Sequence, residues 1–169
     1  MCDYSFDWKL HAGVFFEMDN TSHHYMEIAL EEAAIAGRHG EVPVGAVIVN
    51  SETKNIVAQT RNSMEELNDP TAHAEMQAIR KAAFIVDETR LVKCDIYVTL
   101  EPCPMCAQAI SFARLRRVYF GAYDPKGGGI DHGPRIFEQP SCHHRPEIIG
   151  GLCETDSILL LKNFFSSLR

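Results

Sequence analysis

The segment DIYVTLEPCPMCAQAISFARLRRVYFGAY, residues 95–123, predicts a strand, a helix and a second strand in direct succession. Its opening run DIYVTL is rich in β-branched and aromatic residues, which is typical of a buried strand. Pro102 favours a helix from about Cys103 to Ala113, because proline is well tolerated at a helix start, and RVYFGAY predicts the second strand. A helix that connects two strands in this way indicates an α/β fold with a layered sheet.

The same alternation continues on both sides of this segment. Residues 21–39 have apolar positions at helical spacing, and the strand-like runs 42–50 and 55–60 predict a hairpin. Asp69 and Pro70 suit the N-cap and the first position of a helix that continues to about Val86. The glycines of PKGGGIDHG predict a loop over residues 125–133, followed by a short strand at 146–151 and a helix at 154–168. No internal repeat or long linker divides the chain, so we expect one domain.

Composition limits the classes of function that remain open. A length of 169 residues with 46% hydrophobic residues fits one globular domain, and no apolar run approaches the ~18 residues of a membrane span. The net charge of −7 argues against a general nucleic-acid binder, which usually displays a basic face. The charge is uneven, however, because residues 110–169 carry eight Lys or Arg and six Asp or Glu. A polyanionic partner is therefore expected to meet mainly the C-terminal third.

The N-terminal run MCDYSFDWKLHAGVFFE carries acidic residues and has no long apolar stretch followed by a cleavage site. We therefore expect neither a secretory signal nor a mitochondrial presequence, and a cytoplasmic location. In that reducing compartment the close pair Cys103 and Cys106 is a metal or redox candidate rather than a disulfide. The other four cysteines are expected to be ordinary thiols.

Two short patterns carry the candidate chemistry. At the start of a helix, Cys103 and Cys106 can point both sulfur atoms at one ion, and the helix N-terminus favours the thiolate form that binds metal. His73, in the segment NDPTAHAEMQAIRKAA, supplies a nitrogen if the two helix starts converge. Three protein ligands leave the fourth position of a catalytic zinc for water, whose pKa such a site lowers to about 7. Glu75 is then the expected shuttle for the proton of that water.

Neither pattern is specific when it stands alone. An isolated Cys-x-x-Cys is often a redox pair or a structural zinc site, and an isolated His-x-Glu is usually surface decoration. A closed zinc site would need a fourth ligand, and Cys142, His143 and His144 are candidates, although three consecutive residues chelate one ion awkwardly. The two patterns together, each at a predicted helix start, are similar to the arrangement of zinc-dependent nucleobase deaminases.

Longer stretches resemble the TadA-type tRNA-specific adenosine deaminases of bacteria. They are EVPVGAVIV, RNSMEELNDPTAHAEMQAIR, YVTLEPCPMCAQAISFARLRRVYFGAYDPKGG and HHRPEIIGG, with a final helix containing NFF. The resemblance implies a three-layer α/β/α cytidine-deaminase-like fold, with a central mixed sheet of about five strands and helices on both faces. It also implies a zinc-dependent deaminase domain over residues 21–169, after a poorly ordered N-terminal extension over residues 1–20. Because residues 1–17 match nothing expected of the family, we hypothesise that translation starts at Met18.

The resemblance further implies an activity and its partners. The expected reaction is hydrolytic conversion of adenosine to inosine at the wobble position of a tRNA anticodon, in an arginine tRNA with the anticodon ACG. A single-stranded loop makes it cheap for the target base to leave its stack. The family is homodimeric, so a homodimer is expected, with no membrane and no DNA partner.

Site residues follow from the resemblance position by position. It implies one Zn²⁺ per subunit on His73, Cys103 and Cys106, with Glu75 as the proton shuttle. The implied substrate contacts are Asn62 to the base, Val42 and Pro43 as the wall of the base pocket, Asp124 to the sugar, and Phe164 and Phe165 to the anticodon loop. Candidates for phosphate contacts around the pocket are Arg114, Arg116, Arg117, Lys126, His144 and Arg145.

Two rival functions remain open. Guanine deaminase, a free-base enzyme, has very similar NDPTAHAE and EPCPMC segments, whereas the basic run RLRRVYFGAYDPKGG and the HHRPEIIGG and NFF segments suit a large RNA partner better. A catalytically inactive tRNA-binding subunit would use zinc only for structure. Glu75 argues against that second rival, because such a subunit needs no proton shuttle.

Overall fold

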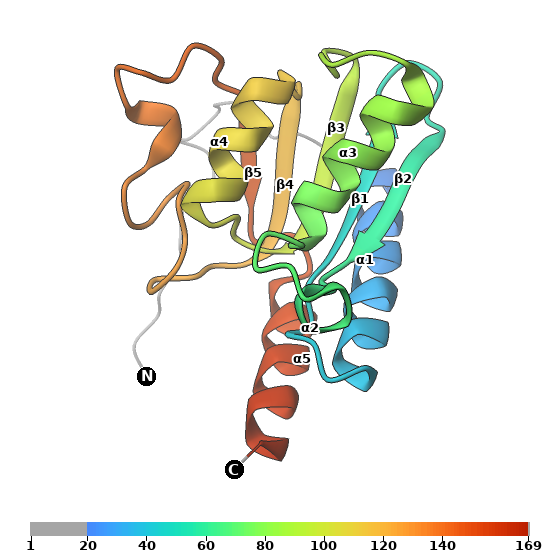
Figure 1. Ribbon diagram of the computed structural model, residues 1–169, viewed down its shortest axis with the longest axis vertical. Helices are drawn as coiled ribbons and strands as arrows, with labels where there is room; N and C mark the ends of the chain where they lie inside the picture. The colour runs from blue at the N-terminus through green and yellow to red at the C-terminus, as the bar shows by residue number, and fades with distance from the viewer. Residues whose placement is uncertain (1–19, 169) are drawn as a thin grey trace, which may run out of the picture.

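Five strands form one sheet in the order β2-β1-β3-β4-β5 in a computed structural model that describes residues 20–168 (Figure 1). β1 (Gly45–Asn50) is antiparallel to both β2 (Ile56–Arg61) and β3 (Cys94–Leu100). β3, β4 (Arg117–Ala122) and β5 (Glu147–Gly150) are parallel to one another. The prediction of a mixed sheet of about five strands is therefore confirmed.

Helices cover both faces of this sheet. α1 (Asn20–Arg38) and α5 (Glu154–Ser167) pack on one face, and α3 (Ala74–Val86) and α4 (Pro104–Ala113) on the other (Figure 1). Strand side chains alternate between the two cores: Val47 and Tyr97 belong to the core under α1, whereas Ile48 and Ile96 belong to the core under α3 and α4. Burial on both faces explains why the three central strands, β1, β3 and β4, have nearly continuous apolar runs.

Small residues let the helices approach the sheet closely. Ala29 and Ala33 of α1 are fully buried, and so are Ala74, Ala78 and Ala82 of α3. A Cβ atom at Gly45 would lie 2.0 Å from the carbonyl oxygen of Ala29, so β1 and α1 meet backbone to backbone at that point. The alanine repeat in each helix is what the i, i+4 spacing of a buried helix face requires.

The predicted start of α3 is wrong. The helix begins at Ala74 with His73 as its N-cap, and not at Pro70. Asp69 instead accepts hydrogen bonds from the N–H and hydroxyl groups of Thr71, at 2.8 and 2.7 Å. This side-chain turn competes with helix formation, which is why an Asp-Pro pair starts a helix at some positions and a turn at others.

The remaining differences are small. β1 begins three residues later than expected, and two short helices that the sequence did not predict are α2 (Met64–Leu67) and the 3₁₀ helix η2 (Ile136–Glu138). The proposed N-terminal extension and the Met18 start lie outside the described residues, except for Asn20, the first residue of α1. Among the helices of residues 20–168, none combines the length and apolar character needed to cross a bilayer.

Candidate metal and substrate site

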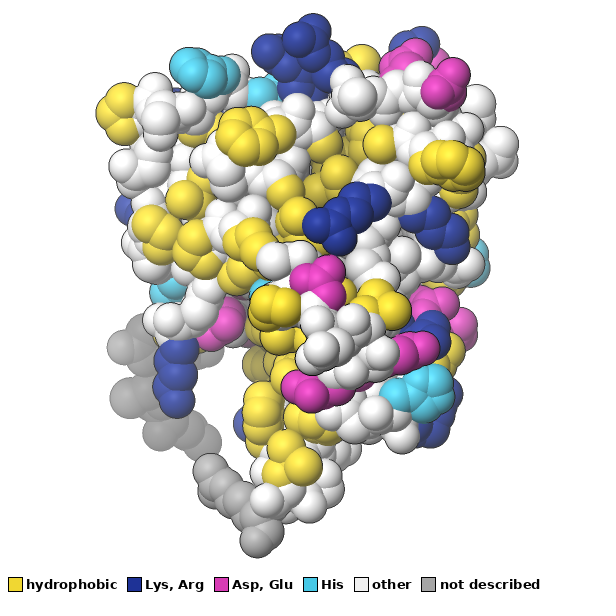
Figure 2. Space-filling model, viewed as in Figure 1, with side chains coloured by type: hydrophobic (Ala, Val, Ile, Leu, Met, Phe, Trp, Pro, Cys, Tyr) yellow, Lys and Arg dark blue, Asp and Glu magenta, His cyan; other side chains and the backbone are white. Residues whose placement is uncertain are grey.

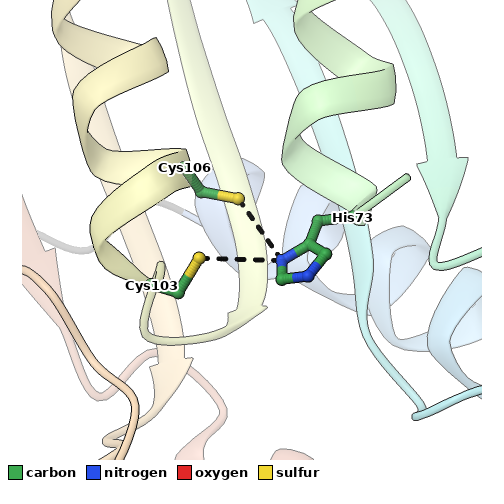
Figure 3. A group of neighbouring side chains, drawn as sticks. All are labelled: His73, Cys103 and Cys106. Carbon is green, nitrogen blue, oxygen red and sulfur yellow. Dashed lines mark hydrogen bonds between the residues drawn. The ribbon is translucent and has the colours of Figure 1, made fainter. Parts of the chain in front are cut away.

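The starts of α3 and α4 meet at the edge of the sheet where the parallel strands end, the edge at which open α/β sheets usually bind ligands. His73 is the N-cap of α3 and Cys103 is the N-cap of α4, both with extended backbone, and Cys106 lies in the first turn of α4. Neither N-cap side chain caps its own helix. Both side chains are thus available to a ligand, and Figure 3 shows them turned toward each other together with Cys106.

The three side chains have the spacing of a zinc site. Nδ1 of His73 lies 3.7 Å from Sγ of Cys103 and 3.6 Å from Sγ of Cys106. Tetrahedral ligands at ~2.0 Å (nitrogen) and ~2.3 Å (sulfur) from a zinc ion lie roughly 3.6 Å apart. One imidazole and two thiols that fit these distances could hold Zn²⁺ with a fourth position left for water.

Electrostatics favour a thiolate in this cluster. A hydrogen bond from Cys106 lowers the pKa of Cys103 to about 4, and the neighbouring His73 acts in the same direction. The contact with Cys103 in turn raises the pKa of His73. Zinc binds thiolates and a neutral imidazole, so an ion bound here would still displace a proton from a protonated His73 and the thiol proton of Cys106.

A fourth protein ligand is not brought to this cluster. Cys142 lies beside Ser111, with 3.3 Å between Sγ and Oγ, near the other end of α4. The imidazole of His144 lies 2.6 Å from the carbonyl oxygen of Leu115, which follows that same helix end. In residues 20–168, the group His73, Cys103 and Cys106 is the one cluster of three potential metal ligands, so a site closed by Cys142, His143 or His144 is not supported.

A cavity of about 200 Å³ adjoins the cluster. Of the residues expected at the site, Val42, Asn62 and Asp124 line it together with His73, Glu75 and Cys103. Pro43 is buried but does not line the cavity. The sequence did not predict the remaining lining residues, which are Val44, Met64, Leu100, Glu101 and Gly127.

Glu75 lies in the first turn of α3 and is 4% exposed. Burial raises the pKa of its carboxyl group to about 7, although the positive charge of His73 acts in the opposite direction. A carboxyl group with a pKa in this range can both accept and donate a proton at neutral pH.

The amide of Asn62 has a fixed orientation. Its Oδ1 atom accepts a hydrogen bond of 2.9 Å from the backbone N–H of Ala74, the first residue of α3. A backbone N–H can only donate, so the oxygen must face α3 and the NH₂ group must face away from it. Asn62 therefore offers a hydrogen-bond donor to a ligand in the cavity.

Two buried carboxylates hold the walls of the cavity, and the sequence predicted neither. Glu41 accepts hydrogen bonds from the backbone N–H groups of Met64, Glu65 and Glu66 at 2.8–3.0 Å, and so fixes α2. Glu101 accepts hydrogen bonds from the loop that follows β4. The available signal was an acidic residue directly beside an apolar run, in EVPVGAV and in VTLEPC.

A groove of about 850 Å³ continues from the cavity, with which it shares Val42, Leu100, Asp124 and Gly127. Its other walls are the loop after β4 and the end of α5, where Lys126 and Phe165 lie. Phe164 does not line this groove but packs edge to face on Phe165, with 5.3 Å between the ring centroids.

Most of the expected phosphate contacts lie elsewhere. Arg116 and Arg117 stand at the start of β4 and pair with Asp95 and Glu147. Arg114, His144 and Arg145 also precede β4 or β5, at the sheet edge opposite the cavity. The reason is that β3, β4 and β5 run in the same direction. Residues that precede these strands in the sequence therefore lie at one edge of the sheet, and residues that follow them lie at the opposite edge. Within one subunit these side chains do not surround the cavity, contrary to the expectation, and of the six candidates only Lys126 lines the adjoining groove.

Comparison with known proteins agrees with this geometry. Residues 19–122 match the family described as the cytidine and deoxycytidylate deaminase zinc-binding region. The tRNA-specific adenosine deaminase of Agrobacterium fabrum is 52% identical over 146 residues, which cover 86% of this chain and 95% of that protein. The chain belongs to the tRNA-specific adenosine deaminases. The Bacillus subtilis member of this group is 41% identical over 86% of the chain and 89% of its own length.

Solved structures confirm the fold of this group. A structure from a study of A-to-I editing by tRNA:A34 deaminases at the wobble position is 53% identical, with a TM-score of 0.79, and covers 82% of this chain and 99% of that one. A guanine deaminase from Bacillus subtilis is 40% identical but covers only 59% of this chain and 63% of its own, with a TM-score of 0.56. The tRNA-specific deaminases thus match along the chain, whereas this guanine deaminase matches little more than half of it.

Proposed function

We propose that the protein hydrolyses the exocyclic amino group of adenosine at the wobble position of a tRNA anticodon and so produces inosine. The observation that carries the proposal is the placement of Asn62 and Glu75 in one cavity with the His-Cys-Cys cluster. This cavity is smaller than the ~300–1,000 Å³ of typical ligand pockets, so it suits a single base. The adjoining groove suits the neighbouring nucleotides of the same strand.

In the proposed reaction, His73, Cys103 and Cys106 hold one Zn²⁺ per subunit. Zinc in an open site of this kind activates a water molecule as a nucleophile. Glu75 takes a proton from the attacking water and delivers it to the leaving amino nitrogen, so a C–O bond forms, the C–N bond breaks and ammonia leaves. The Asn62 NH₂ group donates to the ring of the base and orients it.

The substrate is proposed to be an anticodon loop, with ACG of an arginine tRNA as the first candidate. The target base leaves its stack and enters the cavity beside Val42, while Asp124, Lys126 and Phe165 contact the sugar and flanking nucleotides in the groove. Phe164 acts through its ring contact with Phe165. A tRNA substrate also supports the expected cytoplasmic location.

A homodimer is the proposed assembly. The layer formed by α3 and α4 exposes large apolar side chains, among them Phe84 at 86% and Phe112 at 72% exposed fraction. Figure 2 shows hydrophobic side chains spread over this face. An apolar surface of this kind is typical of a protein interface. In a homodimer, Arg145 of one subunit, which is distant from its own cavity, could contact RNA that is bound at the cavity of the other subunit.

The decisive experiment supplies purified protein with an ACG anticodon stem-loop, free guanine or free cytidine, and measures inosine, xanthine and uridine. We expect inosine in the RNA alone. Xanthine without inosine would establish the guanine deaminase rival, and no product from any substrate would favour the inactive binding subunit.

A variant connects this activity to the cavity. Glu75→Gln keeps the shape of the side chain but removes proton transfer, so kcat should fall by about 10²–10⁴-fold or more while the bound zinc measured by atomic absorption stays the same. Glu88→Gln, an exposed position after the end of α3, is the matched control and should behave like the wild type. Activity of Glu75→Gln near the wild-type value would refute the proposed role.

A further inference from the structure

The buried side chain of Glu101 binds the loop between β4 and η2 at several points. The Glu101 carboxylate is 0% exposed. Its Oε1 atom accepts hydrogen bonds from the backbone N–H groups of Ile130, Asp131 and His132 at 2.9–3.2 Å. Its Oε2 atom accepts one from the N–H of Asp124 at 3.0 Å and lies 2.7 Å from Nδ1 of His132. One carboxylate thus binds Asp124, near the start of the loop, and residues 130–132 further along it.

Close packing fits the loop to this carboxylate. A Cβ atom at Gly128 would lie 2.4 Å from Oε1 of Glu101, so the backbone can pass there only as glycine. Asp124 then folds its own side chain over the next residues, because its Oδ1 atom accepts the N–H groups of Lys126 and Gly127 at 3.1 and 3.0 Å. The conformation of residues 124–128 is therefore set by Glu101 at one end and by Asp124 from within.

This loop is the part of the site that faces the groove. Asp124 and Gly127 line both the cavity and the groove, and Lys126 lines the groove. Of the candidate phosphate contacts, Lys126 is the one that lines the groove, whereas Arg116 and Arg117 are paired at the opposite sheet edge. RNA that enters the cavity must therefore pass a surface whose shape depends on Glu101.

We propose that Glu101 is a positioning residue for RNA, which holds residues 124–132 so that Asp124 and Lys126 meet the nucleotides flanking the target base. The proposal rests on the proposed function for the identity of the substrate. It assigns Glu101 no contact with the base and no proton transfer. Its effect is on the binding of the nucleotide chain, through the backbone of the loop.

Steady-state kinetics of Glu101→Gln on the ACG stem-loop test this role. Glutamine has the same shape, but its NH₂ group replaces one acceptor and would face backbone donors. We expect KM to rise by about tenfold or more and kcat to stay within about threefold, with zinc content and circular dichroism unchanged. Asp95→Asn is the matched control, because Asp95 is a buried carboxylate at the opposite sheet edge, paired with Arg116. It should leave KM unchanged.

A double-mutant cycle with Lys126→Ala shows whether Glu101 acts through the loop. If it does, Lys126→Ala raises KM in the wild-type background and has much less effect in the Glu101→Gln background. Full additivity of the two changes, or a fall in kcat with unchanged KM, would overturn the proposal.

Amide hydrogen exchange without RNA separates this proposal from the proposed function. Glu101→Gln should speed exchange at Asp124 and at residues 130–132, and should leave the amides of α3 as they are. Unchanged exchange in the loop would refute the positioning role even if the wild-type protein edits RNA. Fast exchange together with weaker binding of a labelled stem-loop would support it even if the wild-type protein produced no inosine.

Discussion

The two polar groups of the Asn62 side chain, its oxygen and its NH₂ group, have different roles. The oxygen caps α3 by accepting the N–H of Ala74, and this leaves the NH₂ group for the cavity. The same contact ties the position of the donor to the start of the helix that carries His73 and Glu75. A base that bonds to Asn62 is thereby placed relative to both residues.

Asn62→Asp separates these roles. Aspartate can still accept the N–H of Ala74, but it replaces the donor by an oxygen and adds a negative charge beside Glu75. We expect kcat/KM for the stem-loop to fall by about 100-fold, with little change in the melting temperature. Asn62→Ala loses both roles, so it should also lower the free energy of unfolding by about 1 kcal/mol. Equal kcat/KM for Asn62→Asp and the wild type would show that the donor does not contact the substrate.

Site residues that form a motif with close sequence neighbours could be predicted. Residues whose partners are distant in the sequence could not. His73 and Glu75, like Cys103 and Cys106, stand two or three positions apart at a helix start, so their pattern is visible in the sequence. Glu41 and Glu101 bind backbone N–H groups more than 20 positions away. Nothing local indicates such partners, because every residue except proline offers the same N–H group.

At the scale of elements, two physical effects keep the three glycines at positions 127–129 in a loop, and the sequence shows only the first. Conformational entropy disfavours them within a helix or strand, but the structure adds close approach. A Cβ atom at Gly129 would lie 2.6 Å from the backbone nitrogen of Pro104 and 2.9 Å from the carbonyl carbon of Cys103. The loop therefore presses on the start of α4, where two of the three proposed zinc ligands lie.

Gly129→Ala should move that helix start. Because the atoms in the way are backbone, we expect Cys103 to shift and zinc affinity to fall by about 10–100-fold, measured by competition with a chromogenic chelator. Gly37→Ala is the control, since its Cβ would lie an ordinary 3.5 Å from Pro43. That change in α1 should leave zinc affinity unchanged and raise stability by up to about 1 kcal/mol. Wild-type zinc affinity in Gly129→Ala would contradict the argument.

Across the whole molecule, the sheet separates residues that the sequence places close together. Arg117 and Asp124 are seven positions apart, yet they stand at opposite ends of β4, which is roughly 20 Å long at ~3.3 Å per residue. Basic residues do outnumber acidic ones in the C-terminal third, but the direction of the strands decides which of them lie near the cavity. Periodicity predicted the strands and did not specify which residues share an edge.

The apolar face of α3 and α4 predicts that the protein forms a homodimer through this face. If two subunits pair through this face, the wild-type protein should show about twice its chain mass of 19.0 kDa by light scattering after size exclusion. The double variant Phe84→Glu with Phe112→Glu should elute as a monomer, because it places charges where the interface would exclude water. Leu159→Glu is the matched control: Leu159 is a large apolar residue of α5 on the other face, with a 54% exposed fraction. It should remain dimeric, and a Phe84/Phe112 variant that also stays dimeric would place the interface elsewhere.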